Sequence, residues 1–396
     1  MPLPLVCCSA RTVDLPKLPP NHRIPTRRKT TTMQKDPIQL QRSPNVHEKS
    51  PWRCCIAPML DWTDRHYRYL ARLMTRHARL YTEMVTTGAL LHGDVSRHLQ
   101  FNESEHPVAL QIGGSNPVDL ADSAILGVEF GYDEINLNVG CPSDRVQNGS
   151  FGACLMATPE IVAEGVRSMR EAVDVPVTVK TRVGIDRSDS FEAFSRFIDI
   201  VAGQGGCEVF IIHARKAWLD GLSPKENREI PPLRRDFVYR IQDEYPELTF
   251  VLNGKLETLP EMQTELAQVP GGIMVGRAAY EHIDWLRFVD QTLFDAEAIV
   301  PARSVVVQAY RAYMVEALES GVPMPPLLKP LLTLFNGLPG ARAFRRHVSE
   351  QGPKRKTDIH VLDEALALIP DLDAADSAEL EWRRSSPYIP ADQKAG

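Results

Sequence analysis

Several features that define other protein classes are missing from this sequence of 396 residues. No run of about 18 apolar residues without charges occurs, so a membrane span is not expected. The seven cysteines form no CxxC pair and no cysteine–histidine pair with zinc-ligand spacing, and no metal site is predicted. Because their number is odd in a long chain, free thiols in a reducing, cytoplasmic setting are the simplest interpretation.

Two more absences concern a dinucleotide-binding motif and the charge. No GxGxxG pattern follows an expected strand, so no Rossmann domain is predicted. The formal net charge of −6 does not by itself indicate nucleic-acid binding. A mildly acidic protein can still bind RNA through a local basic face, because dissolved ions screen distant charges.

The first 50 residues differ from the rest. They contain eight prolines and the run Arg27-Arg28-Lys29, and no apolar segment precedes a small-residue cleavage site. We therefore expect residues 1–50 to be a disordered basic extension and not a targeting peptide. A true start at Met33 is the alternative.

From about residue 53, short apolar runs alternate with longer amphipathic segments. This alternation predicts βαβ units, and eight of them over about 240 residues fit a closed (β/α)8 TIM barrel better than an open sheet. The expected strands are Cys54–Met59, Leu80–Val85, Val108–Gly113, Glu134–Val139, Val177–Thr181, Val209–His213, Thr249–Asn253 and Gly272–Val275. The expected helices are Asp64–His77, Asn116–Phe130, Pro159–Val173, Phe191–Gln204, Arg234–Tyr245 and Thr258–Gln268.

Strand patterns stop after about residue 300, where helical periodicity continues. Helices are expected at Val305–Glu319, Leu327–Phe335 and Ala341–Glu350. The predicted fold is therefore α/β, a barrel domain at residues 51–300 with a small C-terminal helical domain at 301–370. Residues 371–396 are predicted to be a flexible tail.

Polar or glycine-containing clusters follow most of the expected strands: APM, QIGG, NVGCP, KTR, HAR, NGK and VGR. They could be ordinary turn residues. Barrel enzymes, however, build their active sites at the C-terminal ends of the strands, and the clusters recur in consecutive register. This register predicts a site at that end of the barrel.

The segment Asn138-Val139-Gly140-Cys141-Pro142 places a thiol at the end of the fourth expected strand, before a loop of small residues at 148–153. An unperturbed thiol is mostly protonated at neutral pH and can donate a proton. The alternative is a small buried core residue. We favour function for Cys141 because of its neighbours, and the core for three other cysteines: Cys54, Cys55 and Cys207.

Two further positions indicate a phosphate-bearing cofactor. Asn253-Gly254 follows the seventh expected strand and Gly276-Arg277 follows the eighth, where barrels commonly bind phosphate with help from a helix N-terminus. Lys180 and His213 end the fifth and sixth strands and are expected to face the same mouth. A fixed cation there would stabilise an anionic reduced flavin. A surface lysine and a structural histidine are the alternatives.

Together these residues resemble the tRNA-dihydrouridine synthase family, specifically its A subfamily, over about residues 53–350. The motifs that carry the resemblance are APMLDWTDRHYR from Ala57, TEMV from Thr82, LQIGG from Leu110, NLNVGCPSDRVQNGSFGACLM from Asn136, VKTRVGID from Val179, IIHARKAWLDGLSPKENREIPPL from Ile211 and LPGARAFRR from Leu338. The two long motifs are very specific.

The resemblance implies an FMN-binding catalytic barrel followed by a tRNA-binding helical domain. Cys141 would be the proton donor. FMN would contact Ala57, Pro58, Met59, Gln111, Lys180, His213, Asn253, Gly254, Lys255, Gly276 and Arg277. The residues implied to touch tRNA are Asn138, Lys225, Arg228, Arg342 and Arg345.

The implied reaction reduces a uridine of the tRNA D-loop, at positions 20 and 20a. Hydride would pass from N5 of FMN to C6 of uracil, Cys141 would protonate C5 from the opposite side, and NADPH would re-reduce the flavin at the same mouth. The implied partners are tRNA and NADPH, with no membrane and no protein partner.

One departure stands out, because the family often has Asn-Gly-Gly after the seventh strand and here Lys255 replaces the second glycine. Its backbone N–H remains, so phosphate binding is expected to persist, but its conformation is left open.

The charge distribution agrees with an RNA substrate. Residues 211–235 carry six Lys or Arg against three acids, and residues 329–356 carry seven against one. Arg342, Arg345 and Arg346 share one helical face by their spacing. A solvated face is the usual role of such a run, but in a chain of net negative charge the clustering favours a phosphate-binding surface.

Two alternatives stay open at this point. A small-molecule FMN oxidoreductase of the dihydroorotate dehydrogenase type would share the barrel and the flavin loops, but would not need the basic C-terminal helix. A non-catalytic tRNA-binding protein would not need Cys141, Lys180 and His213.

Overall fold

The computed structural model describes residues 50–143, 146, 149–295 and 297–374. Most of the predicted extension and of the predicted tail lie outside these residues, as does position 148, the first of the small-residue loop. The described residues belong to one compact unit that begins at Glu48.

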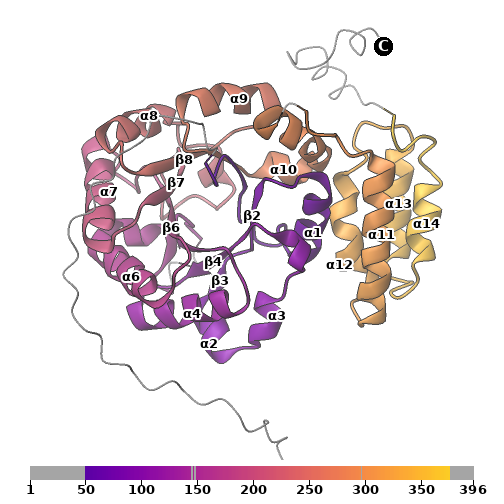
Figure 1. The fold of residues 1–396 in the computed structure, drawn as a ribbon, viewed down its shortest axis with the longest axis horizontal. Coiled ribbons are helices and arrows are strands. Elements are labelled where there is room, and N and C mark those ends of the chain that lie inside the picture. The colour runs from indigo at the N-terminus through magenta and orange to yellow at the C-terminus, as the bar shows by residue number, and fades with distance from the viewer. Residues whose placement is uncertain (1–49, 144–145, 147–148, 296, 375–396) are drawn as a thin grey trace, which may run out of the picture. The chain divides into compact units, whose positions relative to one another are not determined.

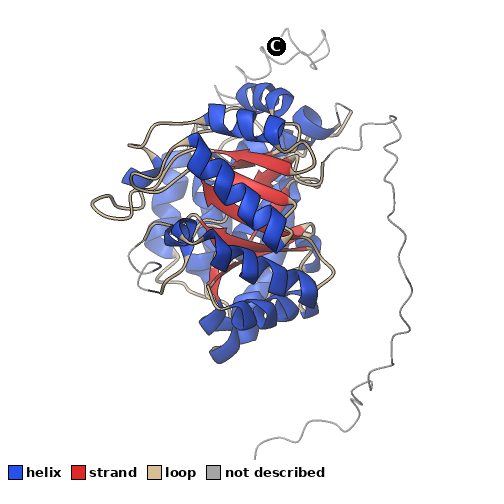
Figure 2. Cartoon of the chain, turned by 90° about the vertical axis from the view of Figure 1, so that its left-hand side faces the viewer, coloured by secondary structure: helices blue, strands red, loops and turns tan. Residues whose placement is uncertain are grey.

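The apolar runs form a closed ring of parallel strands (Figure 1). Neighbouring strands pair in parallel around the ring, and the pairing of β2 with β4 closes it. Figure 2 shows helices packed around the strands. The ring confirms the predicted (β/α)8 barrel. Its strands are β1 (Cys54–Ile56), β2 (Arg79–Tyr81), β3 (Val85–Thr86), β4 (Val108–Gly113), β5 (Glu134–Val139), β6 (Val177–Arg182), β7 (Val209–His213), β8 (Thr249–Asn253) and β9 (Ile273–Val275).

Polar caps fix where several of the barrel helices begin. The Asp64 side chain accepts from the backbone N–H groups of the first turn of α1, and Asn116 does the same for α4. The helices around the barrel are α1 (Arg65–Met74), α2 (Thr87–His92), α3 (Val95–Leu99), α4 (Pro117–Glu129), α6 (Pro159–Ala172), α7 (Phe191–Gly205), α8 (Arg235–Glu244), α9 (Leu259–Gln268) and α10 (Arg277–Glu281). Short 3₁₀ or π turns are η1 (Glu103–Glu105), η2 (Gly152–Ala157), η3 (Glu226–Arg228), η4 (Ile283–Phe288) and η5 (Asp290–Phe294).

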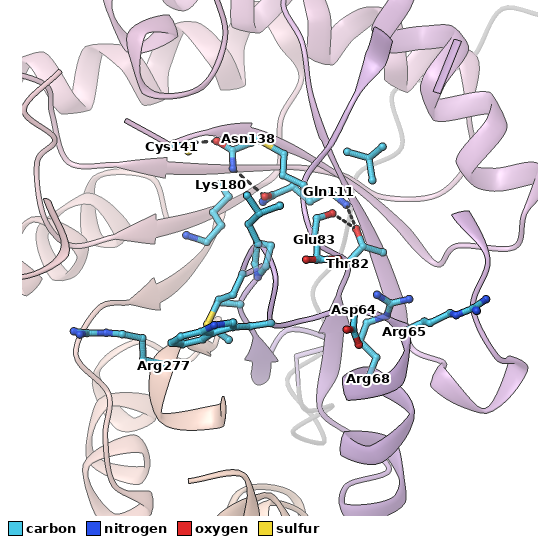
Figure 3. Close-up of a pocket in the computed structure, with 18 of the residues that line it drawn as sticks. Asp64, Arg65, Arg68, Thr82, Glu83, Gln111, Asn138, Cys141, Lys180 and Arg277 are labelled. Carbon is cyan, nitrogen blue, oxygen red and sulfur yellow. Dashed lines mark hydrogen bonds between the residues drawn. The ribbon is translucent and has the colours of Figure 1, made fainter. Parts of the chain in front are cut away.

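The second expected strand, Leu80–Val85, is wrong as one piece, because the chain leaves the sheet between β2 and β3. The Thr82 hydroxyl accepts the backbone N–H of Gln111, so a side chain takes the place of a ladder carbonyl there. This break turns Glu83 toward the open end of the barrel (Figure 3). The first strand also ends early, at Ile56, because the chain turns through Met59 and the N–H of Thr63 donates to the Met59 carbonyl over 2.9 Å.

The barrel interior has an apolar cluster and a polar network. The apolar side chains inside the ring are Cys55, Ala57, Tyr81, Ala109, Val209, Ile211, Val251 and Met274. A larger apolar layer lies between the strands and the helices and includes Cys54 and Cys207. The core interpretation of Cys54, Cys55 and Cys207 is therefore confirmed.

The C-terminal helices pack against α1 and α10 of the barrel (Figure 1). Tyr313 stacks on Tyr69 of α1 with ring centroids 4.0 Å apart, and its hydroxyl lies 2.6 Å from His66. The elements are α11 (Arg303–Glu319), α12 (Met324–Leu328), η6 (Lys329–Thr333), α13 (Ala341–Gln351) and α14 (His360–Leu366). The helix predicted at Leu327–Phe335 is wrong, because Pro330 lacks the N–H that an α-helix needs and the chain tightens into a 3₁₀ turn.

No helix of the described residues is long and apolar enough to cross a membrane.

Candidate active site

A cavity of about 2260 Å³ opens at the C-terminal end of the barrel strands. Cavities that hold one small ligand usually measure about 300–1,000 Å³, so this one has room for a cofactor and a second molecule. Cys141 and every residue predicted to contact the cofactor line it: Ala57, Pro58, Met59, Gln111, Lys180, His213, Asn253, Gly254, Lys255, Gly276 and Arg277. The residues predicted from the sequence therefore lie together at one place in the structure.

Asn138, at the end of β5, positions the Cys141 loop. Its side-chain oxygen accepts the backbone N–H groups of Gly140 and Cys141 over 3.1 and 3.0 Å. The Cys141 carbonyl accepts from Ala153 over 2.9 Å, and a Cβ on Gly152 would lie 2.6 Å from that carbonyl. The chain therefore returns so closely that only glycine fits, and the half-buried thiol is held at the cavity wall (Figure 3).

A chain of side-chain amides runs from this loop into the barrel. The Asn138 amide donates to Gln111 over 2.9 Å, Gln111 donates to Asn136 over 2.7 Å, and Asn136 donates to Thr178 over 2.7 Å. Each amide in the chain has its orientation set by the next one. Gln111 and Asn138 therefore present defined polar atoms to the cavity (Figure 3).

Buried cations line the same mouth. The Lys180 ammonium donates to the Asn253 side chain over 3.1 Å, and burial lowers the pKa of Lys180 to about 7, with Arg182 lowering it further and Cys141 opposing. Arg182 donates to the backbone carbonyls of Gly140, Lys216 and Asn227, and burial lowers its pKa to about 10. Within the described ranges, neither cation forms an ion pair with a carboxylate.

His213 lies beside these cations at the end of β7. Burial first, then the charges of Arg182 and Lys180, lower the pKa of His213 well below its ordinary value. The imidazole is therefore neutral at physiological pH and can serve as a hydrogen-bond donor or acceptor. A mouth with uncompensated buried positive charge favours an anionic ligand.

The structure shows the backbone conformation of Lys255, in the loop after β8, which the sequence left open. Lys255 has φ of 51°, a left-handed backbone that glycine adopts freely and that costs other residues about 1 kcal/mol. Gly254 before it has φ of 131°, and Arg235 donates to the Lys255 carbonyl over 2.8 Å. Arg277, which follows β9 and also lines the cavity, is paired with Glu229 over 2.7 Å. The chain thus keeps the backbone shape of a glycine while carrying a lysine.

Leu60, Trp62 and Glu83 line the cavity but were not predicted as site residues, unlike Ala57, Pro58 and Met59 just before them. Glu83 accepts the N–H of Asp61, which has φ of 64°, and Lys329 of η6 donates to the Asp61 carbonyl. Trp62 stacks on Tyr280 with ring centroids 4.5 Å apart. The cavity wall is therefore fixed to both the barrel and the C-terminal helices. The TEMV motif marked Glu83, but nothing in the sequence shows that the strand breaks there.

The residues predicted to bind tRNA do not all converge. Asn138 and Arg228 line the cavity, whereas Lys225 and Arg342 lie exposed outside its lining. Arg345 donates to Asn336 over 2.7 Å, and Asn336 does line the cavity.

The residues present fit a flavin mononucleotide. Lys180, which has no carboxylate partner among the described residues, and the fixed amide of Gln111 suit a polar ring edge that gains negative charge on reduction. The cavity is large enough for the ring and a nucleobase. In the part of the chain that the structure describes, no group of three His, Cys, Asp or Glu side chains could hold a metal ion.

Comparison with known proteins agrees with this geometry. The model of the dihydrouridine synthase family matches residues 55–369. A tRNA-dihydrouridine(20/20a) synthase of Shewanella oneidensis is 57% identical over 78% of this chain and 91% of its own length. One of Vibrio parahaemolyticus is 55% identical over 80% of this chain and 97% of its own length. A 2-naphthoyl-CoA reductase complex, at 10% identity over 60% of this chain and 50% of that one, has a TM-score of 0.44, too distant a likeness to bear on function.

Proposed function

The chain belongs to the dihydrouridine synthase family, and from that premise we propose that it uses FMN to reduce uridine in tRNA to 5,6-dihydrouridine. The observation that carries the proposal is the position of Cys141 and Lys180 on one cavity that can hold two ligands. The names of the relatives support positions 20 and 20a as the targets.

FMN, when bound, supplies the hydride that C6 of the uracil ring accepts. The Cys141 thiol is placed to donate the proton that C5 needs, which leaves a thiolate. Lys180 and Arg182 line the same cavity, so positive charge faces the place where this negative charge develops. A proton from solvent then restores the thiol for the next turnover, with NADPH proposed as the reductant.

The target base has to leave its stack to reach this cavity, as it does in other enzymes that act on a base. Asn138 and Arg228 line the cavity where the nucleotide would enter, and we assign both to tRNA binding. Lys225, Arg342 and Arg345 are assigned to phosphates farther from the base. Because the substrate is tRNA and the described cysteines are free, we place the reaction in the cytoplasm.

Mass spectrometry of tRNA from a strain that lacks the gene tests the proposal, with each dihydrouridine mapped by position. The expected result is loss of dihydrouridine at positions 20 and 20a, restored by the wild-type gene and by the yellow purified protein with NADPH. Dihydrouridine that persists at both positions would overturn the proposal. Reduction of a free pyrimidine without tRNA would favour a small-molecule oxidoreductase instead.

A further inference from the structure

Lys255 combines three properties that point to a function for its side chain. Its backbone is left-handed, with φ of 51°, where glycine is the usual residue. It lines the cavity next to Gly254 and near Gly276 and Arg277, at the corner where barrels bind phosphate. Its side chain is exposed, so packing does not explain why a lysine is kept there. A residue held in an unfavourable conformation at a ligand site indicates a functional requirement.

The arginines around this corner are already engaged. Arg277 is paired with Glu229 over 2.7 Å. Arg235 is paired with Glu261 and Glu265 over 2.7 and 2.6 Å. A phosphate monoester carries about −1.5 to −2 charges at neutral pH, so it needs positive charge that is not yet neutralised.

Arg215 donates to the backbone carbonyls of Pro231 and Glu229, which hold its guanidinium in place without neutralising its charge. Lys255 differs from these arginines. Of the residues that the structure describes, none forms a hydrogen bond or ion pair with its ammonium. It is therefore a cation of this corner that can turn to a ligand without breaking an existing pair.

We propose that the Lys255 ammonium is a direct ligand of the FMN phosphate, and that the strained turn is kept because it places this charge. The inference rests on the proposed function, since it presumes that FMN is the cofactor. It goes beyond that proposal because it assigns the contact to the side chain and not to the backbone N–H alone. The chemical class recognised is a phosphate monoester at the end of a flavin chain.

Flavin release from the full-length holoprotein tests this role. The protein is loaded with FMN or, by exchange, with riboflavin, which lacks the phosphate, and is then diluted while the fluorescence of the released flavin is recorded. Lys255→Gln removes the charge and keeps the length of the side chain. Lys255→Gly also removes the backbone strain, and Lys255→Arg keeps the charge. Lys354→Gln, at an exposed lysine outside the cavity, is the matched control.

We expect Lys255→Gln and Lys255→Gly to raise the Kd for FMN about 10-fold, as for the loss of one charge-assisted hydrogen bond. The Kd for riboflavin should stay unchanged in both, and Lys255→Arg should bind FMN nearly as the wild type does. An unchanged FMN Kd in Lys255→Gln would overturn the inference. Equal weakening of FMN and riboflavin would also overturn it, because the loop shape and not the phosphate contact would then be responsible.

The same measurement separates this inference from the proposed function. A wild-type protein that retains neither flavin would refute both. A wild-type protein that binds FMN and forms dihydrouridine, beside a Lys255→Gln variant with wild-type FMN affinity, would refute only the role of Lys255.

Discussion

Buried charged residues have different kinds of partner at the two ends of the barrel interior. At the N-terminal end of the strands, the fully buried Glu134 accepts from Trp52, Tyr81 and Thr178 over 2.8, 2.8 and 2.6 Å and pairs with Arg79 over 3.2 Å. Burial alone would lower the pKa of Arg79, but Glu134 raises it above its ordinary value.

At the C-terminal end, Lys180 and Arg182 are also buried, but their partners are an amide oxygen and backbone carbonyls. Burial lowers the pKa of both groups, since no described carboxylate offsets it. A buried charge paired with an opposite charge indicates a structural role, whereas buried cations with no described carboxylate partner indicate a place for a ligand. This difference predicts that substitutions at the two ends will change different properties.

The largest effect is expected from Cys141→Ala at the open end. Removing a general acid should lower turnover of tRNA by about 10²–10⁴-fold, while the flavin spectrum and the melting temperature stay as in the wild type. Cys154→Ala is the matched control, because Cys154 is also half-buried nearby but does not line the cavity. Wild-type turnover by Cys141→Ala would remove the acid role.

At the closed end, Glu134→Gln should change stability instead. The substitution leaves Arg79 buried without its carboxylate, so the free energy of unfolding should fall by about 3 kcal/mol. Urea denaturation measures the difference. Glu208→Gln breaks an exposed ion pair with Arg170 and should cost less than about 0.5 kcal/mol. An equally small loss in Glu134→Gln would show that the two ends do not differ as described.

Much of the fold was predictable because short apolar runs between helix-length segments mark the buried strands in the sequence. The strands at Val108–Gly113, Glu134–Val139, Val209–His213 and Thr249–Asn253 were predicted with the bounds observed. The second strand was not, because its break depends on the Thr82 hydroxyl meeting the backbone of Gln111, a contact between distant residues. Single-sequence periodicity cannot report a contact of that kind.

The sequence predicted which residues line the site, but not which of its charged residues lack an oppositely charged partner. Strand ends converge in a barrel, so the cavity lining followed from the order of the motifs. The absence of described carboxylate partners for Lys180 and Arg182, and the clamp on Asp61 from Glu83 and Lys329, depend on three-dimensional neighbours. The assignments of individual residues to FMN and tRNA remain predictions.

The variant Lys180→Met tests the difference between the two ends of the barrel through the pH dependence of stability. In the folded flavin-free protein the pKa of Lys180 is about 7, below the ordinary 10.5 that the unfolded chain retains. Between these values the unfolded state binds more protons, so this lysine makes stability rise with pH, by up to about 1.4 kcal/mol per pH unit.

The test is the free energy of unfolding of flavin-free wild type and Lys180→Met, compared at pH 7 and pH 9. The variant should be the more stable at pH 7, and the difference should shrink by pH 9. Lys216→Met, which removes a lysine paired with Asp189 over 2.6 Å, should not reproduce this trend. A difference that is constant with pH would mean that the Lys180 ammonium is not desolvated.

The smallest effect is expected on α13, where Arg342 is exposed and Arg345 is half-buried beside Asn336. Arg342→Glu with Arg345→Glu should raise the Kd for tRNA about 10-fold near 0.1 M salt and flatten its salt dependence by about one to two phosphate contacts. Arg167→Glu with Arg240→Glu, exposed on α6 and α8 across the barrel, is the matched control for net charge. Equal weakening in both pairs would make the effect one of total charge, and no weakening in α13 would move the RNA surface elsewhere. Since these arginines lie outside the cavity lining, turnover at saturating tRNA should stay near wild type, which separates binding of the RNA from reduction of its base.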